Sequence, residues 1–530
     1  MHRRPGSGSA KFGVTRRKGI WAMKPSHGLT RREVMGMGVA IGLPAAWSLA
    51  AERSSEGPAL RRADTPRNII FMIADGMSTG VPSLAEPFSR LVRGTGTWFY
   101  RLAQEPDNAQ GLFEMRSLNS LVTDSAAAST AWSSGSRVIN GAINVLPDGT
   151  KLTPLAPLMR STRRRVGLVT TTMVAHATPA AFAAVQADRD DMHLIAPQYL
   201  DMVDVILGGG REHFDGALRA DGQDWLERFA KSGYDVVSSR DGMITAKLAG
   251  RMLGVFGVGH LPFTIDRRNS EVLSRTVPTL AEMTRTALRA LSSGGDGFLL
   301  QVEGGRVDHA AHANDAAALL WDQLAFDDAI GVVMEFVAEH PDTLVVITSD
   351  HGNANPGLNG MGAAYAESDA CFENLAHATA SFDEIRRRVK AAAAPAAPSD
   401  DHVIDVLRDV TGAQITRSEA QAVAAAWNDS YPSELNRQHR NFVGVLGQVL
   451  GNYNGIGWTG ITHTADLVMS LTVGRGRDLF RGFLRNVDAF PRLTRLAGVR
   501  HENPQVAPED ARRLAAQVMS RSALRHTQAA

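Results

Sequence analysis

The chain carries six short runs of mostly apolar residues. They are too short to span a membrane, and too uniformly apolar for strands that have one solvent-exposed face. They lie at residues 68–74, 166–172, 203–207, 298–302, 344–348 and 467–473. Such runs are typical of strands in a parallel sheet that is buried on both faces. Residues 315–339 instead repeat their apolar side chains at helical spacing. Alternating strands and helices predict an α/β fold with a mainly parallel central sheet sandwiched by helices.

The composition changes between residues 353 and 457. Four amphipathic stretches have the apolar spacing of helices, at residues 382–390, 402–410, 419–427 and 442–450. Residues 391–398 (AAAAPAAP) are low in complexity and are expected to form a linker. We therefore expect a largely helical insertion or cap at about residues 356–456, within a single domain that extends over residues 51–530.

Residues 1–50 have the pattern of a twin-arginine signal peptide. Nine of the chain's 56 Lys and Arg residues fall here, with one of its 55 acidic residues. Arg31-Arg32 precedes an apolar run over residues 34–50, which ends in a small-x-small cleavage site, SLA. We therefore expect the twin-arginine export machinery to be a partner of the precursor, and a periplasmic or secreted location.

The remaining residues carry 47 basic and 54 acidic side chains, so the exported body is mildly acidic. A nucleic-acid-binding domain is therefore not expected. Apart from the leader, the chain has no run of 18 apolar residues, and we expect no membrane span in the mature chain. A single cysteine, Cys371, excludes an intramolecular disulfide and a zinc site built from cysteines.

Acidic and histidine residues stand at or just beyond the ends of three of the predicted strands: Asp75, Glu303 and the pair Asp350-His351. In open α/β sheets, ligands gather at the carboxyl ends of the strands. An acid such as Asp75 is also a common helix N-cap, so its position alone leaves a metal role open.

Residues 302–312 (VEGGRVDHAAH) carry the most specific pattern in the chain. Asp308 and His312 stand four residues apart, which places them on one face of a helical turn. Oxygen and imidazole ligands without a thiolate suit zinc in a catalytic site, and Glu303 is better matched to a harder ion. Another histidine, His463, lies in residues 460–466 (GITHTAD) near the last predicted strand.

Two further segments carry candidate anion-binding residues. In residues 122–131 (VTDSAAASTA), Ser125 precedes small residues that suit the start of a helix, where free N–H groups favour an anion. A simple helix N-cap is the alternative for this serine. Downstream of residues 176–179 (HATP), Arg189 could bind two phosphoryl oxygens, although a lone arginine is more often a surface charge.

Together these segments resemble the alkaline phosphatase family. The DGM, DSAA, HATPAA, VEGGRVDHAAH, SDHG and THTADL segments occur in the family's order, between about residues 67 and 480. The resemblance implies an alkaline-phosphatase-like fold for the catalytic domain. It also implies a metal-dependent enzyme that hydrolyses small phosphate monoesters to an alcohol and inorganic phosphate.

The resemblance implies two Zn²⁺ and one Mg²⁺ per chain. One zinc would be held by Asp308, His312 and His463, and the second by Asp75, Asp350 and His351. The magnesium would be held by Asp75, Thr178 and Glu303. Ser125 is the implied nucleophile and a metal contact, Arg189 is the implied phosphate clamp, and Asp124 would orient that clamp. His176 and His309 stand where the family varies, and are candidates for contacts to phosphate or to the magnesium site.

This implied site predicts hydrolysis through a phosphoserine, with two zinc ions stabilising the attacking and leaving oxygens. A phosphodiesterase of the same superfamily is an alternative, but it usually has a threonine nucleophile and lacks a clamp like Arg189. A sulfatase would need a C/S-x-P-x-R context, which Ser125 does not have. A catalytically inactive metal- or phosphate-binding protein is the alternative from a different class. A homodimer is compatible with the sequence, which leaves the oligomeric state open.

Overall fold

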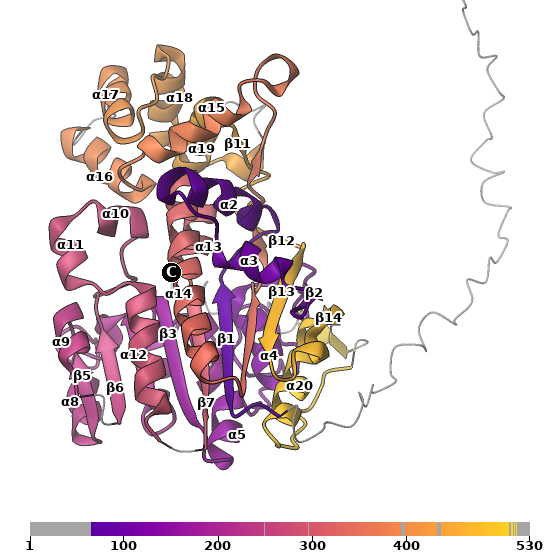
Figure 1. The fold of residues 1–530 in the computed structure, drawn as a ribbon. Coiled ribbons are helices and arrows are strands. Elements are labelled where there is room, and N and C mark those ends of the chain that lie inside the picture. The colour runs from indigo at the N-terminus through magenta and orange to yellow at the C-terminus, as the bar shows by residue number, and fades with distance from the viewer. Residues whose placement is uncertain are drawn as a thin grey trace, which may run out of the picture. The chain divides into compact units, whose positions relative to one another are not determined.

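A ten-stranded sheet lies at the centre of the part of the chain that the structure describes (Figure 1). The structure is a computed structural model that describes residues 65–516 apart from 248–249, 295, 394–397, 432–435, 508–509, 512 and 515. The predicted signal peptide and part of the predicted 391–398 linker lie outside the described residues. In sheet order the strands are β14 (Gly482–Arg485), β2 (Ala109–Glu114), β13 (Leu467–Gly474), β8 (Thr343–Thr348), β1 (Asn68–Ala74), β7 (Phe298–Gly304), β3 (Arg165–Met173), β4 (Val205–Gly209), β6 (Arg251–Val255) and β5 (Tyr234–Val237).

Nine of these strands run in the same direction, and β13 alone runs against them. The central strands β1, β3, β7 and β8 are almost wholly buried, as expected for strands covered on both faces. The predicted fold class, a mainly parallel sheet sandwiched by helices, is confirmed.

Two hydrophobic cores cover the two faces of the sheet. Successive residues of β1 alternate between them, with Ile70 and Met72 in one core and Phe71 and Ile73 in the other. The first core is covered by α2 (Gly80–Arg93), α3 (Trp98–Gln104), α10 (Thr264–Arg268), α12 (Leu280–Ser292), α13 (Arg306–His312) and α14 (Ala316–Glu339). The second is covered by α4 (Ser125–Ser134), α5 (Leu155–Ser161), α6 (Ala177–Ala183) and α20 (Ala489–Leu496).

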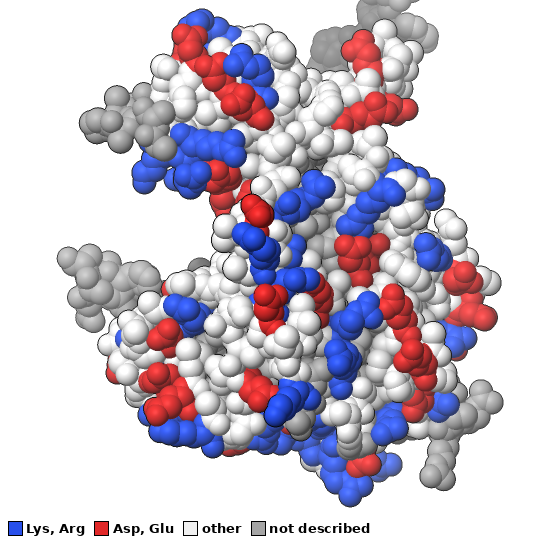
Figure 2. Space-filling model, turned by 60° about the vertical axis from the view of Figure 1, so that its left-hand side comes forward, with Lys and Arg blue, Asp and Glu red and all other residues white. Residues whose placement is uncertain are grey.

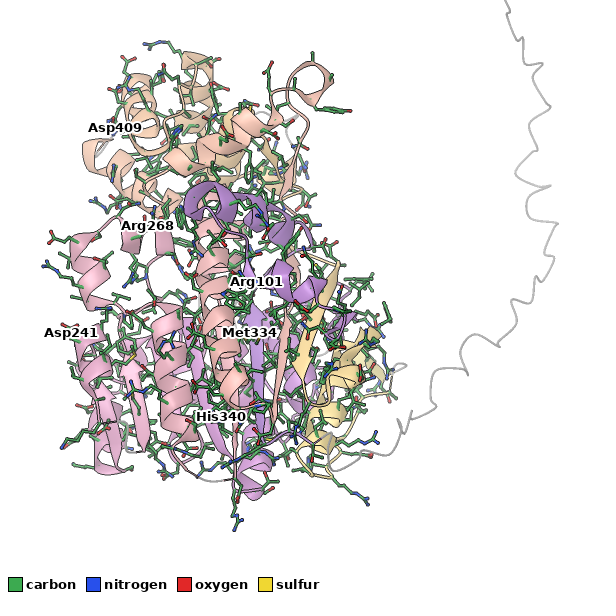
Figure 3. All side chains as sticks on the ribbon, in the orientation of Figure 1. Arg101, Asp241, Arg268, Met334, His340 and Asp409 are labelled. Atoms are coloured by element: carbon green, nitrogen blue, oxygen red, sulfur yellow. The ribbon has the colours of Figure 1, made fainter. Side chains whose placement is uncertain are left out.

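Helix α14 is the helix predicted over residues 315–339. Its N-cap is Asp315, whose carboxylate accepts a hydrogen bond from the Ala318 amide. Most of the helix is buried, and its apolar side chains belong to the first hydrophobic core (Figure 3, where Met334 lies on this helix and His340 directly after its end). Shorter helices lie along the connections of the sheet: α7 (Met192–Ile195), α8 (Trp225–Lys231), α9 (Arg240–Thr245) and α11 (Glu271–Thr276).

The largely helical insertion begins and ends at one place. There β10 (Gly357–Leu358) pairs with β11 (Ile456–Gly457) in antiparallel register. Between these strands lie α15 (Ser368–Glu373), α16 (Phe382–Ala393), α17 (Asp400–Thr411), α18 (Arg417–Trp427) and α19 (Phe442–Asn454). Helices α16 to α19 share a hydrophobic core of their own, which explains their amphipathic sequence pattern.

On the face shown in Figure 2, acidic and basic side chains are interspersed in small groups. In the described part of the chain, every helix is too short or too polar to cross a lipid bilayer.

Candidate active site

The predicted site residues meet at the carboxyl edge of the central strands. Strands β8, β1 and β7 are neighbours in the sheet, and Asp350, Asp75 and Glu303 stand at or just beyond their carboxyl ends. His463 reaches the same edge from the opposite direction, because β13 is antiparallel and its start lies where the other strands end. A two-residue pairing of β12 (His463–Thr464) with β9 (Gly352–Asn353) fixes His463 beside the end of β8.

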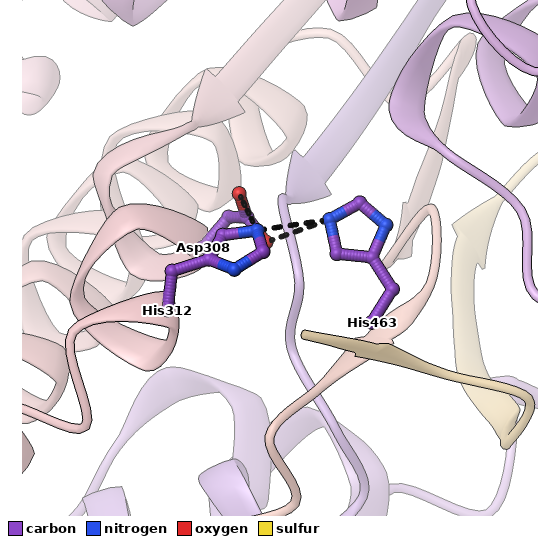
Figure 4. A group of neighbouring side chains, drawn as sticks. All are labelled: Asp308, His312 and His463. Atoms are coloured by element: carbon purple, nitrogen blue, oxygen red, sulfur yellow. Dashed lines mark hydrogen bonds and ion pairs between the residues drawn. The ribbon is translucent and has the colours of Figure 1, made fainter. Parts of the chain in front are cut away.

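Asp308, His312 and His463 form the first group of candidate metal ligands (Figure 4). One carboxylate oxygen of Asp308 lies 3.4 Å from His312 Nε2, and the other lies 3.6 Å from His463 Nε2. The two Nε2 atoms are 3.0 Å apart. Burial would lower the pKa of His312, but the Asp308 carboxylate raises that pKa to about 9.

The hydrogen bonds of these two histidines place a proton on Nδ1 of each ring, so Nε2 is the atom that a cation would bind in place of a proton. His312 Nδ1 lies 2.7 Å from the carbonyl oxygen of Ile461, and His463 Nδ1 lies 2.9 Å from that of Thr123. A carbonyl only accepts, so each Nδ1 donates, and a neutral ring then carries its lone pair on Nε2. Two such lone pairs and a carboxylate converge at one point, which is the arrangement of a metal site oriented by outer hydrogen bonds.

Asp75, Asp350 and His351 form a second, fully buried group. His351 Nε2 lies 3.5 Å from an Asp75 oxygen and 3.2 Å from an Asp350 oxygen. Burial raises the pKa of Asp350 to about 6, helped by the charge of Asp308, and burial also raises the pKa of Asp75 well above its ordinary value. Without a cation, these adjacent carboxyl groups cannot all ionise.

The third group joins Asp75 and Glu303 to His176. Burial raises the pKa of Glu303 to about 7, although Thr170 donates a hydrogen bond to its carboxylate. Thr178 also reaches this group, with its hydroxyl 3.5 Å from an Asp75 oxygen. The structure thus places His176, which the sequence left between two roles, beside the candidate ligands of the third metal.

The donor atoms of the three groups fit divalent cations. Buried carboxylate oxygens of Asp75, Glu303 and Asp350 have no hydrogen-bond partner within the described residues. Such unpartnered polar atoms in a protein interior indicate a missing ion or water. Imidazole and carboxylate in the first two groups suit Zn²⁺, and the third group, richer in oxygen, suits Mg²⁺.

Ser125 is the first residue of α4, and its side chain is buried. Its Oγ lies 3.2 Å from His351 Nε2, so this hydroxyl borders the second group. Asp124 is the N-cap of α4, with one carboxylate oxygen accepting from the Ala127 amide at 2.9 Å. The free N–H groups of the first helical turn therefore face the same space as the hydroxyl, which suits an anion.

Arg189 is held beside this helix and is not a solvated surface charge. Its Nη1 donates to an Asp124 oxygen at 3.1 Å, and its Nη2 lies 3.0 Å from His176 Nε2. The backbone N–H of Arg189 donates to Gly141, whose own amide donates to the same Asp124 oxygen. Only 19% of the arginine side chain is exposed.

Comparison with known proteins places the chain in a family. Residues 66–498 match the family model described as alkaline phosphatase. The chain belongs to the alkaline phosphatase family. It is therefore a phosphoric monoester hydrolase, and the family's dependence on metals agrees with the three ligand groups.

Relatives include alkaline phosphatase 3 of Bacillus subtilis, 28% identical over 446 residues, which cover 80% of this chain and 87% of the relative. Streptomycin-6-phosphate phosphatase of Streptomyces griseus is 34% identical over 367 residues, which cover 60% of this chain and 78% of the relative. Among solved structures, the alkaline phosphatase of Thermus thermophilus has a TM-score of 0.79 and 34% identity, and the match covers 88% of this chain and 99% of that one.

Three residues beside the active site of this alkaline phosphatase were not identified by the sequence analysis. Asn353 donates to Asp308 at 2.7 Å and steadies that candidate ligand. His260 follows β6, and its ring lies 4.5 Å from that of His309, measured between ring centres. Arg306 contacts His309 directly. His260 would have been found by the strand-end rule, had β6 been recognised as a strand.

Proposed function

We propose that this alkaline phosphatase hydrolyses phosphate monoesters through a phosphoserine on Ser125, with two Zn²⁺ and one Mg²⁺ bound per chain. The observation that carries the proposal is the position of the Ser125 hydroxyl. It stands at the N-terminus of α4, next to His351 of a candidate metal group and next to the Asp124 that holds Arg189.

The first zinc is assigned to Asp308, His312 and His463, and the second to Asp75, Asp350 and His351. The magnesium is assigned to Asp75, Thr178 and Glu303. His176 lies beside these residues, but its Nε2 accepts from Arg189, so a neutral ring carries its proton on Nδ1 and is not assigned as a ligand. When bound, these cations supply positive charge for the attacking, leaving and phosphoryl oxygens and lower the pKa of the serine hydroxyl.

The side chains of the protein then have separate tasks. Arg189 donates two hydrogen bonds to oxygens of the phosphoryl group, and the amides at the start of α4 bind the same charge. The Ser125 hydroxyl gives its proton to solvent, and its oxygen attacks phosphorus. The bond from phosphorus to the alcohol oxygen breaks, and that oxygen takes up a proton from water. A water molecule then attacks the phosphorus of the phosphoserine and loses a proton, the bond from phosphorus to the serine oxygen breaks, and inorganic phosphate leaves. The serine oxygen takes up a proton.

Export through the twin-arginine pathway to the periplasm or the medium is part of the proposal. It is supported by the Arg31-Arg32 pair and the apolar run over residues 34–50. This pathway carries folded proteins, so the metal sites can be filled before export.

Elemental analysis and trapping of the intermediate test the chemical part of the proposal. We expect about two zinc and one magnesium per folded chain, and phosphate on Ser125 after an acid quench. Ser129→Ala is a matched control, because Ser129 is buried on the same helix and its hydroxyl has no partner within the described residues. One bound ion per chain, or phosphate on another residue, would overturn the assignment.

A further inference from the structure

Arg306 fixes which nitrogen of His309 carries the proton. Both residues lie on α13, and Arg306 Nη1 is 2.7 Å from His309 Nδ1. A guanidinium only donates, so Nδ1 of His309 accepts. A neutral imidazole has one N–H, which must then lie on Nε2.

The position of Arg306 is itself tightly determined. Its side chain is 10% exposed, and its guanidinium carbon lies 3.6 Å from the centre of the Phe263 ring. Its backbone N–H donates to the Thr171 hydroxyl at 3.1 Å. Its Nη2 lies 3.5 Å from a carboxylate oxygen of Asp383, at the start of α16 in the helical insertion. The insertion thus contributes one charge to the support of Arg306.

The remaining nitrogen of His309 is available to a ligand. Among the described residues, none hydrogen-bonds to Nε2, and the ring is partly exposed. Its centre lies 5.8 Å from that of His176, which in turn contacts Arg189. A donor on Nε2 is therefore close to the space in which Arg189 would bind a phosphoryl group.

We propose that Arg306, held by Asp383 of the insertion, is a positioning residue that makes His309 an N–H donor to the phosphoryl oxygens. The inference rests on the proposed function, because it places the phosphoryl group beside Arg189. Arg306 touches no reacting atom and acts only through the histidine. The helical insertion then has a role at the active site: Asp383 limits the movement of Arg306.

The tautomer of His309 is the direct test. In metal-loaded protein with ¹⁵N-labelled histidine, and with His309→Gln to assign the signals, wild-type His309 should show an N–H on Nε2. Arg306→Met keeps an apolar side chain over Phe263 but removes the donor, so it should give a mixture of both tautomers. A ring that remains wholly in the Nε2–H form in this variant would overturn the inference.

Binding of inorganic phosphate, measured by calorimetry and without turnover, is the second readout. Arg306→Met should weaken it up to roughly tenfold, since part of a hydrogen bond to a charged group is lost. In a His309→Ala background, the same substitution should have no further effect. Equal effects in both backgrounds would show that Arg306 acts on structure alone and would refute the proposal.

Two more variants keep the test decisive. Asp383→Asn leaves Arg306 in place but removes the charge that holds it. It should change the tautomer of His309 and the affinity for phosphate in the same direction as Arg306→Met, but by a smaller amount. If neither quantity changes, the insertion does not support Arg306. Arg388→Met removes a pair with Glu384 elsewhere on α16 and should leave both readouts unchanged. Failure to trap phosphate on Ser125 would refute the proposed function instead, and both readouts are independent of that result.

Discussion

Arg189→Ala should separate monoester from diester hydrolysis. A monoester offers Arg189 one more free oxygen and one more negative charge than a diester, so it uses the guanidinium more fully. Hydrogen bonds to charged groups contribute about 1.5–3 kcal/mol each, and about 1.4 kcal/mol is a factor of ten. We therefore expect kcat/KM for a monoester to fall roughly ten-fold to a thousand-fold, with a much smaller loss for a diester.

The structure indicates that this substitution leaves the nucleophile in place. Without Arg189, Asp124 still accepts from the amides of Ala127 and Gly141, both at 2.9 Å, so the start of α4 keeps its cap. Arg160→Ala is a matched control, because Arg160 forms a similar pair with Asp204 at 3.0 Å outside the site. Arg160→Ala should leave kcat/KM for both the monoester and the diester almost unchanged.

The assay is steady-state kinetics on one monoester and one diester, with the metal content of each variant measured. Inhibition by inorganic phosphate should weaken in parallel with the monoester loss. Small and equal losses for both substrates would mean that Arg189 only holds Asp124 and does not bind the phosphoryl group. That result would also remove the main structural argument for a preference for monoesters.

Three further predictions follow from other parts of the chain. Ser125→Ala should abolish the covalent phosphoenzyme while metal analysis finds the sites still filled; loss of the metals as well would assign this serine a mainly structural role. Burial raises the pKa of Asp322 to about 7. The free energy of unfolding that depends on its neutral form is therefore fully present below the ordinary pKa of the carboxyl group, and it is lost as the pH rises through about 7. Asp322→Asn should therefore raise the Tm relative to wild type more at pH 8 than at pH 5, with metals saturating, and an equal difference at both values would contradict this sign. Changing Arg31 and Arg32 together to lysine should leave full-length precursor in the cytoplasm, and unchanged export on fractionation would refute the twin-arginine route.

The sequence predicted most of the buried strands, and also β13, which has exposed positions. It missed the buried strand β6 and the shorter or partly exposed strands β2, β5 and β14. Strands β1, β3, β7 and β8 are continuous apolar runs because helices cover both of their faces. Strand β2 has the sequence AQGLFE and is partly exposed, and the edge strands β5 and β14 have four residues each. Such segments owe their pairing to neighbouring strands, and little in their own sequence marks them.

The candidate ligands were accessible to sequence analysis because parallel strands end at a common edge. Contacts that depend on how the insertion packs could not be predicted from the sequence. Asp383 and Arg306 are far apart in the chain, and in the sequence each of them resembles an ordinary charged residue of the surface. His176 was assigned between two roles because its neighbours Asp75 and Glu303 come from other strands, and only the folded chain shows all three together.

The antiparallel strand β13 explains how the last part of the domain completes a site built at the ends of parallel strands. A parallel strand in that position would place its start, and the residues just before it, at the opposite edge of the sheet. Because β13 runs the other way, His463 lies just before a strand and still reaches the carboxyl edge, where its Nε2 approaches Asp308 and His312. The first metal group therefore depends on the direction of one strand, and the short pairing of His463 with Asn353 fixes its position.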